Sequence, residues 1–134
     1  MRLHLEDEKM RFALFLLVMM SSTANAATGN SLSKVIRVLQ PGDGTFGGCM
    51  IEIGKMPAGL NCPTSDTDLA GPSGWVTLDC EGKYGSKSYG NSKLNLAMAG
   101  LVMDQNVQVF VDDSRGDDGI CYASQVRLAS PSYN

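Results

Sequence analysis

Two alternating segments near the C-terminal end of the chain constrain its fold most strongly. In residues 107–111, three valines alternate with a glutamine and a phenylalanine. A second alternating run is formed by Ile120, Tyr122, Ser124, Val126 and Leu128. An alternation with a period of two residues predicts β-strands. The intervening residues 112–119 are rich in Asp and Gly, which is typical of the turn of a β-hairpin. Because Cys121 follows this turn, we expect a disulfide to tie the hairpin to an earlier part of the chain.

The N-terminal segment has the layout of a secretory signal peptide. An unbroken apolar run, residues 12–20, follows two basic residues and precedes the triplet Ala24-Asn25-Ala26. These features predict a signal peptide over residues 1–26, with cleavage after Ala26. The apolar run is too short to cross a membrane as a helix, which needs ~20 residues. We therefore expect residues 27–134 to form one domain that is secreted or periplasmic.

The start of translation is a separate expectation. The acidic residues 6–8 precede the apolar run, where a signal peptide normally carries positive charge. A start at Met10 would leave a compact signal peptide without these residues, and we expect the natural start there.

Charge and histidine content exclude several classes of function. Residues 27–134 contain eight Lys and Arg against eleven Asp and Glu, which gives a net charge of −3. There is no basic run, so nucleic acids and anionic membrane surfaces are poor candidate partners. The only histidine, His4, lies in the predicted signal peptide, so the domain lacks the usual activated nucleophiles and His-containing zinc sites. We expect a protein that is not an enzyme, with no catalytic residue, metal or cofactor.

The cysteine pattern predicts two disulfides. An even number of cysteines in an exported chain indicates disulfide bonding, and their wide spacing does not suit a four-thiolate zinc site. Three connectivities are open, and we favour a local clip, Cys49–Cys62, with a long-range staple, Cys80–Cys121. The chain-entropy model assigns these loops ~3 and ~4 kcal/mol of stability. The four cysteines are Cys49, Cys62, Cys80 and Cys121.

The remaining chain supplies three more strands and one helix. We predict strands at residues 34–39, 48–53 and 75–80, and a helix at residues 92–105. Residues 27–33 are expected to be a loose N-terminus and residues 54–73 a long loop. The fold class is therefore mainly β with one α-helix, in the order strand, strand, strand, helix, strand, strand. We expect an OB-fold-like small antiparallel barrel, or alternatively a helix packed on an antiparallel sheet.

The predicted helix is apolar on more than one side. One stripe has the spacing of a core-facing side, yet further apolar residues lie on the other sides. The apolar residues on the second side predict that a neighbouring subunit covers that side of the helix. The alternative is that they are a few exposed apolar residues that the fold tolerates. The stripe is formed by Leu94, Ala97, Met98, Leu101 and Val102, and the other apolar positions are Leu96, Ala99, Gly100 and Met103.

A Gly-rich segment before the helix carries candidate ligand-binding residues. Tyr84, Tyr89 and Asn91 combine aromatic faces with short polar side chains, a combination that suits sugar or peptide binding without acid–base chemistry. The alternative is that both tyrosines are half-buried anchors of the loop. Trp75 is expected to belong to the core.

The acidic hairpin turn is a second candidate surface. Its carboxylates could recognise another protein, or supply oxygen ligands to calcium, although the spacing of an EF-hand is absent. They could equally form a solvated turn in which Asp and Gly serve only the backbone geometry. The triplet 115–117 spells RGD, which is a weak signal for adhesion-receptor binding. The four acidic residues are Asp112, Asp113, Asp117 and Asp118.

The order of elements resembles that of a known family. A strand leads by a turn into residues 49–53, Cys62 follows a Pro/Gly-rich loop, and the helix runs into residues 105–110. In these features the chain resembles the receptor-binding B subunits of AB5 toxins, nearest to the subtilase-cytotoxin and pertussis-like group. The resemblance implies an OB-fold, a ring-shaped pentamer with helices lining its centre, and glycan binding. It also implies that Ser33 and Glu52 help to hold a sialylated sugar.

The chain departs from that family at its C-terminal end. The family's aromatic-rich C-terminal region is absent, and the hairpin with Cys121 is particular to this chain. Its pattern also resembles small uncharacterised exported proteins of Gram-negative bacteria. We therefore predict an exported non-enzymatic binding domain with glycan as the expected ligand. The alternative is a periplasmic or secreted structural or inhibitor-like protein that binds another protein through the acidic hairpin at residues 112–119.

Overall fold

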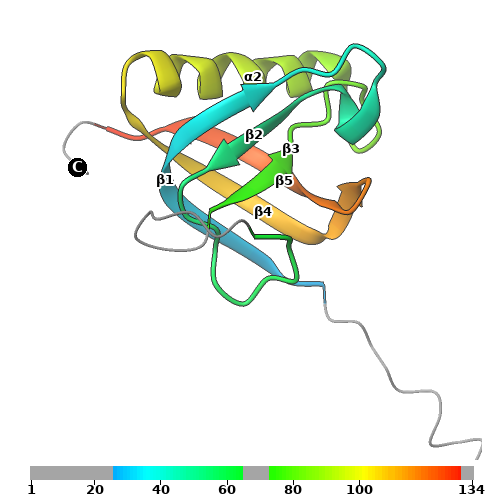
Figure 1. Cartoon of the computed structure of the whole chain (residues 1–134), viewed down its shortest axis with the longest axis horizontal. Coiled ribbons are helices and arrows are strands. Elements are labelled where there is room, and N and C mark those ends of the chain that lie inside the picture. Colours follow the sequence, from blue (N-terminus) through cyan, green and yellow to red (C-terminus); the bar gives the residue numbers. More distant parts are fainter. Residues whose placement is uncertain (1–25, 65–72, 131–134) are drawn as a thin grey trace, which may run out of the picture.

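The computed structural model describes residues 26–64 and 73–130 (Figure 1). The predicted order of three strands, a helix and two strands is confirmed, with a short 3-10 turn added after the first strand. The predicted signal peptide lies outside the described residues, apart from Ala26. The elements are β1 (Thr28–Leu39), η1 (Thr45–Gly48), β2 (Met50–Ile53), β3 (Gly74–Thr77), α2 (Lys87–Val102), β4 (Asn106–Asp117) and β5 (Ile120–Leu128).

The five strands close into a barrel with the order β1-β2-β3-β5-β4. This is the OB-fold-like barrel that the sequence predicts, with α2 between β3 and β4 (Figure 1). The expectation of a purely antiparallel barrel is wrong, because β3 and β5 run parallel. An odd number of strands cannot alternate in direction around a closed ring, so one seam must be parallel.

The core fills the barrel with side chains from alternate strand positions. On β4 the buried residues are Val107, Val109 and Val111, as the alternation predicts. The helix α2 packs against β1, β5 and β4. Its close approach depends on glycine, because a Cβ at Gly100 would lie only 2.5 Å from Cγ1 of Val107.

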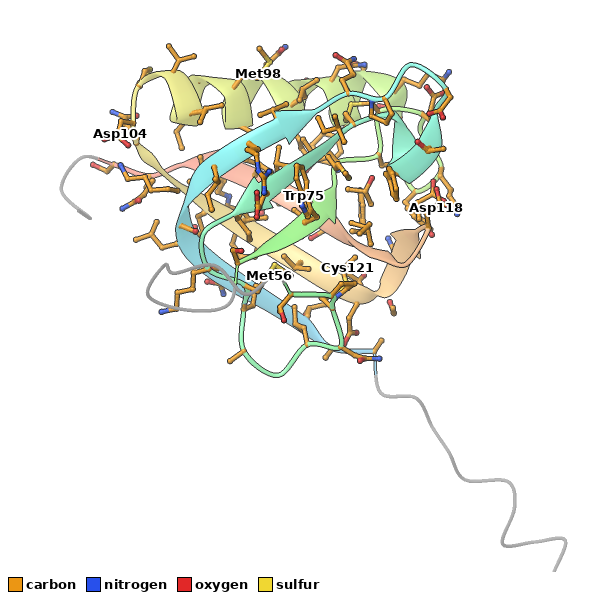
Figure 2. All side chains as sticks on the ribbon, viewed as in Figure 1. Met56, Trp75, Met98, Asp104, Asp118 and Cys121 are labelled. Atoms are coloured by element: carbon orange, nitrogen blue, oxygen red, sulfur yellow. A yellow bond between two sulfur atoms is a disulfide. The ribbon has the colours of Figure 1, made fainter. Side chains whose placement is uncertain are left out.

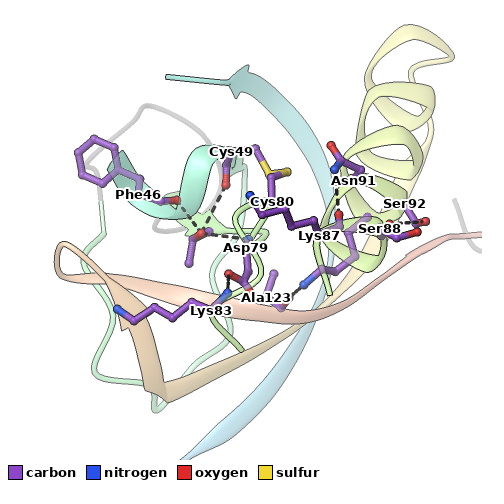
Figure 3. The surroundings of a disulfide bond; sticks show 12 residues. Phe46, Cys49, Asp79, Cys80, Lys83, Lys87, Ser88, Asn91, Ser92 and Ala123 are labelled. Carbon is purple, nitrogen blue, oxygen red and sulfur yellow. Dashed lines mark hydrogen bonds between the residues drawn. A yellow bond between two sulfur atoms is a disulfide. The ribbon is translucent and has the colours of Figure 1, made fainter. Parts of the chain in front are cut away.

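The disulfides join Cys49 to Cys80 and Cys62 to Cys121, so the predicted connectivity is wrong. Strands β2 and β3 are antiparallel neighbours, and Cys49 directly precedes β2 while Cys80 lies just beyond β3. Their Cα atoms are therefore 5.6 Å apart, in the normal range for a disulfide (Figure 3). Cys62 is left to pair with Cys121, and this bond ties the loop after β2 to β5.

The N-terminal residues 27–33, expected to be loose, mostly belong to a strand. From Thr28 onwards β1 pairs with β4, with Thr28 opposite Asp112 and Lys34 opposite Asn106. This pairing joins segments that lie far apart in the sequence, and the mostly small and polar residues 28–33 have no alternation that would predict a strand. The first half of β1 thus completes the barrel on the β4 side, and the second half completes it on the β2 side.

The helix begins at Lys87, five positions before its predicted start at residue 92. Ser86 is the N-cap, and its side chain accepts a hydrogen bond from the Tyr89 N–H. The side-chain oxygen of a serine N-cap accepts a hydrogen bond from one of the backbone N–H groups that have no partner at the start of a helix. The helix therefore includes the Tyr89 and Asn91 positions that we expected in the preceding loop.

The buried side of α2 is rotated away from the predicted apolar stripe. Leu94 and Ala97 are buried as expected, but Met98, Leu101 and Val102 are 46%, 39% and 82% exposed. The barrel is instead contacted by a side that includes two glycines and a lysine, which a hydropathy pattern does not rank as apolar. The buried residues of α2 are Gly90, Lys93, Leu94, Ala97 and Gly100.

The acidic loop of the hairpin is shorter than predicted. Strand β4 continues to Asp117, which pairs with Ile120, so only Asp118 and Gly119 form the turn. Both have positive φ, +49° and +81°. This is the geometry of a two-residue type I′ hairpin turn, for which Asp-Gly is a preferred sequence.

Candidate ligand-binding surface

The predicted site residues Tyr84 and Tyr89 lie in a compact cluster with two residues that the sequence analysis missed. We call this the tyrosine–lysine cluster, formed by Tyr84, Tyr89, Lys93 and Tyr122. The Lys93 Nζ lies 4.2 Å from the ring centroid of Tyr122 and 5.0 Å from that of Tyr89. It donates hydrogen bonds to the Tyr122 hydroxyl at 3.1 Å and to the carbonyl of Ala123 at 2.8 Å.

The lysine of this cluster is 2% exposed. Burial disfavours the charged ammonium and lowers the pKa of Lys93 to about 8, while the negative charge of Asp79 opposes this shift. No motif in the sequence marks Lys93 as buried, since a lysine on a helix is normally taken as solvent-exposed.

The polar groups of the predicted binding residues are occupied by contacts within the fold. The Tyr84 hydroxyl donates to the carbonyl of Gly116 and accepts from the Gly116 N–H at 3.1 Å. The Tyr89 hydroxyl donates to the carbonyl of Ser124 at 3.2 Å. The Asn91 side-chain amide donates to the carbonyl of Lys87 on its own helix at 2.8 Å (Figure 3).

Asp79 organises the loop that carries Tyr84, and the sequence analysis did not single it out. Its carboxylate accepts backbone N–H groups from Lys83 at 2.6 Å, Tyr84 at 2.8 Å and Gly85 at 3.1 Å. Asp79 is buried and has a positive φ of +62°, a conformation that Asp tolerates better than most residues. The only sequence signal for it is an Asp at the end of a strand and before a Gly-containing turn.

Ser33 and Glu52, which the family resemblance suggested, hold separate parts of the barrel. The Ser33 hydroxyl donates to the carbonyl of Lys34 at 3.2 Å and accepts the Lys55 N–H at 2.9 Å. The contact with Lys55 fastens β1 to the chain after β2, whereas the contact with Lys34 stays within β1.

Glu52 is fully buried on β2, beneath the exposed Arg37. The Arg37 Nε donates to its carboxylate at 2.5 Å, and the Ser73 hydroxyl lies 3.4 Å from it. The Arg37 guanidinium lies 5.4 Å from the ring centroid of Trp75. This hydrogen bond and the carboxylate charge raise the pKa of Arg37.

Of the two carboxylates at the base of the hairpin, Asp112 contacts the backbone of its own strand and Asp113 contacts the backbone of two other segments. Asp112 accepts the Ser114 N–H at 2.9 Å. Asp113 accepts the Ala27 N–H at 2.7 Å through one oxygen and the Asn61 N–H at 3.1 Å through the other. These two hydrogen bonds lower the pKa of Asp113.

The two carboxylates at the hairpin tip are also engaged. Asp117 forms an ion pair with Lys83 at 3.3 Å, and Asp118 accepts the Phe46 N–H at 3.1 Å. In Figure 2, Asp118 lies on the opposite side of the molecule from Asp104. Within residues 26–64 and 73–130, no three His, Cys, Asp or Glu side chains gather where they could hold a metal ion.

A different surface brings polar and aromatic side chains together on the outside of β1, β4 and β5. Cross-strand registry places them in two rows of three, each row crossing the strands β1, β4 and β5 in that order. The buried residues Val109 on β4 and Val126 on β5 point into the barrel, so the residues on either side of them along each strand point outwards. We call this the outer face; its rows are Leu32, Gln108 and Arg127, and Asn30, Phe110 and Gln125.

Diagonal contacts join the two rows. The Arg127 guanidinium lies 5.2 Å from the ring centroid of Phe110. The side-chain amide nitrogen of Gln108, Nε2, lies 3.5 Å from the side-chain oxygen Oδ1 of Asn30. Side chains two positions apart across neighbouring strands are close enough for such pairs. A cation above the Phe110 ring restricts the guanidinium to one region of the surface.

Two shallow hollows flank these contacts. The first has a volume of about 320 Å³ and the second about 370 Å³. Each is within the size range of a small-ligand site, although both are open to solvent. The first is lined by Leu32, Gln108, Arg127, Leu128, Ala129 and Ser130. The second is lined by Thr28, Gly29, Asn30, Phe110 and Ser124.

The outer face has a cation but no acidic side chain. The described part of the chain forms five ion pairs, and none of them includes Arg127. Its guanidinium, which no described residue engages in an ion pair, therefore keeps hydrogen-bond donors for a ligand. The alternation in β4 was a sequence signal for the outward position of Gln108 and Phe110. The surface as a whole could not be predicted, because it also requires the pairing of β1 with β4.

The outward side of α2 beyond its first residue, Lys87, is a second surface without exposed charge. From Ser88 to Met103 the only charged residue is Lys93, and it is buried. Met98, labelled in Figure 2, lies on the side of α2 that faces away from the barrel. A helix facing water normally carries charged side chains on its exposed side, so this composition is unusual.

Comparison with known proteins finds no protein-family model, no curated relative and no solved structure that matches this chain. No helix in the described part of the chain combines the length and hydropathy required to span a membrane. Fold and surfaces together define a disulfide-linked β-barrel with one helix and an amide-rich outer face.

Proposed function

We propose that this protein is a non-catalytic carbohydrate-binding domain that recognises its ligand on the outer face. The observation that supports this most directly is the set of three amides, one phenylalanine and one arginine in two registered rows, the arginine forming no ion pair with any described residue. The side-chain amides provide both donors and acceptors, and the guanidinium provides donors, for the hydroxyl groups of a sugar. The aromatic ring supplies an apolar surface for the C–H side of the sugar ring.

The size of the hollows favours one or two sugar units at a time. Because the hollows are open, much of a bound sugar would stay in water, and the affinity of one site should be low. This is the behaviour of a domain that binds a repeated surface ligand rather than a single soluble molecule. The resemblance to toxin B subunits supports the same ligand class.

We propose an exported location for this domain. Two disulfides are typical of proteins from oxidising compartments, and the predicted signal peptide supports the same conclusion. Secretion and retention in the periplasm are both consistent with these features.

We also infer that a second copy of the chain covers the exposed side of α2. A surface that meets its own copy must not bring like charges together, and this surface carries none. A second copy would also raise the avidity of a weak sugar site without any new contact to the sugar. Because a 16-residue helix is only ~24 Å long, the association should be weak and concentration-dependent.

Analytical ultracentrifugation tests this association. The mass should rise with concentration for the natural sequence and stay monomeric for Val102→Glu, whose parent side chain is 82% exposed. Ala58→Glu adds the same charge on the exposed loop after β2, away from the helix, and should leave the association unchanged. A natural sequence that stays monomeric at high concentration would eliminate this part of the proposal.

A printed array of defined neutral and carboxylated oligosaccharides tests the carbohydrate proposal. We expect binding without turnover, and loss of binding in Phe110→Ala and Arg127→Gln. The matched control is Tyr89→Phe, which changes an aromatic residue in the tyrosine–lysine cluster. Binding that depends on Tyr89 and not on Arg127 would place the ligand elsewhere, and an array without any bound sugar would reject the proposal.

Protein binding through the hairpin is the alternative. A hollow of about 260 Å³ beside the hairpin is lined in part by Asn61, Asp113 and Arg115. A partner protein whose capture depends on Asp117 and Asp118, together with an empty sugar array, would favour this alternative.

A further inference from the structure

The beginning of β1 meets a carboxylate at the position where the signal peptide is predicted to be removed. The Ala27 nitrogen lies 2.7 Å from Oδ1 of Asp113 on β4. In return, the Asp113 N–H donates to the carbonyl of Ala27 at 3.1 Å. The other oxygen of Asp113 accepts the Asn61 N–H at 3.1 Å. Ala27 is therefore held on both its nitrogen and its oxygen, and Ala26 is exposed just before it.

We propose that Asp113 is the acceptor for the mature amino terminus, and that removal of the leader creates an ion pair at this position. Hydrolysis of the Ala26–Ala27 peptide bond adds one water molecule, leaves a carboxylate on Ala26 and leaves the Ala27 nitrogen as an ammonium group. Water is the co-reactant, and the catalyst is an endopeptidase that cleaves after small residues. The inference rests on the predicted cleavage site and is independent of the proposed carbohydrate binding.

Cleavage changes the chemistry of an existing contact without requiring the chain to move. Before cleavage, the Ala27 nitrogen is an amide with one N–H and no charge. After cleavage, it is a cation with three donors, at hydrogen-bond distance from a carboxylate. Hydrogen bonds between ionised groups are shorter and about twice as strong as those between neutral groups. The mature chain should therefore hold the first residues of β1 more tightly than the precursor does.

The surroundings of Asp113 favour its charged form. The Asn61 and Ala27 N–H groups lower the pKa of Asp113, so the carboxylate is ionised at neutral pH. The neighbouring acidic group, Asp112, is bound to Ser114 and lies 3.5 Å from Arg115. Asp113 is thus the carboxylate available to the new ammonium, and this pairing should raise the pKa of the Ala27 amine.

The contact also joins three segments at one end of the barrel. Asp113 binds the start of β1 through Ala27 and the loop after β2 through Asn61. Cys62, the residue after Asn61, is fixed to β5 by its disulfide. The new terminus would therefore fasten β1 at a point where the loop and β5 are already covalently linked.

The experiment uses the full chain, exported and processed by a bacterial host. Sequencing from the N-terminus should give Ala27 as the first residue. In a titration followed by NMR, the Ala27 amine should show a pKa about one unit above the ordinary value of about 8. Asp113→Asn should return it to the ordinary value, because the amide keeps a hydrogen-bond acceptor but has no charge.

Two further variants separate this contact from general effects. Insertion of one glycine between Ala26 and Ala27 restores the amide at Ala27 and should lower the melting temperature by about 4 °C. Asp112→Asn removes a neighbouring charge of the same sign and should leave the amine pKa raised. A different first residue after processing would overturn the proposal. An ordinary amine pKa in both the natural sequence and Asp113→Asn would also overturn it.

Discussion

The tyrosine–lysine cluster and the outer face contain the same kinds of side chain in opposite states. In the cluster, the Lys93 ammonium lies 4.2 Å from the ring centroid of Tyr122; on the outer face, the Arg127 guanidinium lies 5.2 Å from that of Phe110. Lys93 is buried and donates to two oxygens of the fold, whereas Arg127 is exposed and forms no ion pair in the described part of the chain. Residue type therefore does not distinguish a binding surface from a structural cluster, but the engagement of the polar groups does.

The difference follows from what packs above each strand. The helix α2 lies over the part of β5 that carries Tyr122, so aromatic and cationic groups there must satisfy each other. In the described part of the chain, the outward side chains of β1 and β4 stay open to solvent: Asn30 is exposed and Gln108 is half-buried. The same chemistry is therefore used for stability at one position and left open to a ligand at the other.

The largest effect on stability is expected at the carboxylate that supports the cluster. Asp79→Ala removes the acceptor of three backbone N–H groups and places alanine at a positive φ. Unpaired donors and the strained backbone together should cost about 3 kcal/mol of unfolding free energy, measured by denaturant unfolding with the disulfides intact. The outer face should keep its ligand affinity in the folded fraction.

The control for this substitution is Asp79→Asn. Its carbonyl oxygen still accepts N–H groups, and Asn tolerates positive φ better than other residues do. The loss should be clearly smaller than for alanine. Equal losses in both variants would mean that the negative charge, rather than the hydrogen bonds, stabilises the loop.

The second effect is a pH dependence caused by Lys93. Its folded pKa of about 8 lies below the ordinary value of 10.5, so the unfolded chain binds more protons between these values. The unfolding free energy should therefore rise by about 2 kcal/mol from about pH 7 to about pH 9.5. Lys93→Met should abolish most of this rise, because a methionine has no charge to desolvate. An equally steep rise in Lys93→Met would assign the pH dependence to another group.

A smaller effect is expected at the tyrosine that anchors the hairpin. Tyr84→Phe keeps the ring but removes the hydroxyl that donates to and accepts from the backbone of Gly116. The loss should be about 1 kcal/mol in a denaturant titration, the ordinary contribution of such hydrogen bonds. Ligand binding at the outer face should not change, and reduced sugar binding in Tyr84→Phe would restore the tyrosines as ligand contacts.

Much of this fold is predictable because local patterns agree with it. The alternation in β4 and β5 defines the hairpin, and the apolar residues around Leu94 define a helix. The disulfide pairing was not predictable, because Cys49 meets Cys80 only when β2 and β3 pair, and spacing along the chain does not report that pairing. The parallel seam between β3 and β5 follows from closure of five strands, which is a property of the whole barrel.

The candidate sites show the same division between local and non-local information. The sequence identified Tyr84 and Tyr89, and the structure places both in one cluster, but their hydroxyl groups serve the backbone. The outer face was missed because its rows need three strands in registry. Two of its six residues, Asn30 and Leu32, come from residues 27–33, which have no strand pattern of their own. Registry between distant strands is set by core packing, which a pattern along one strand does not contain.

The smallest effect on stability, and the sharpest test of the comparison, is expected at Arg127. Arg127→Gln removes an exposed cation that forms no ion pair in the described part of the chain, so the unfolding free energy should change by less than about 0.5 kcal/mol. The affinity for a sugar found on the array should fall at least about tenfold in calorimetric titration, since a hydrogen bond from a charged donor is lost. Lys93→Gln should show the reverse, with a clear loss of stability and unchanged affinity. If Arg127→Gln destabilises the fold as much as Lys93→Gln does, the outer face is a structural cluster as well, and the ligand must be sought on another surface.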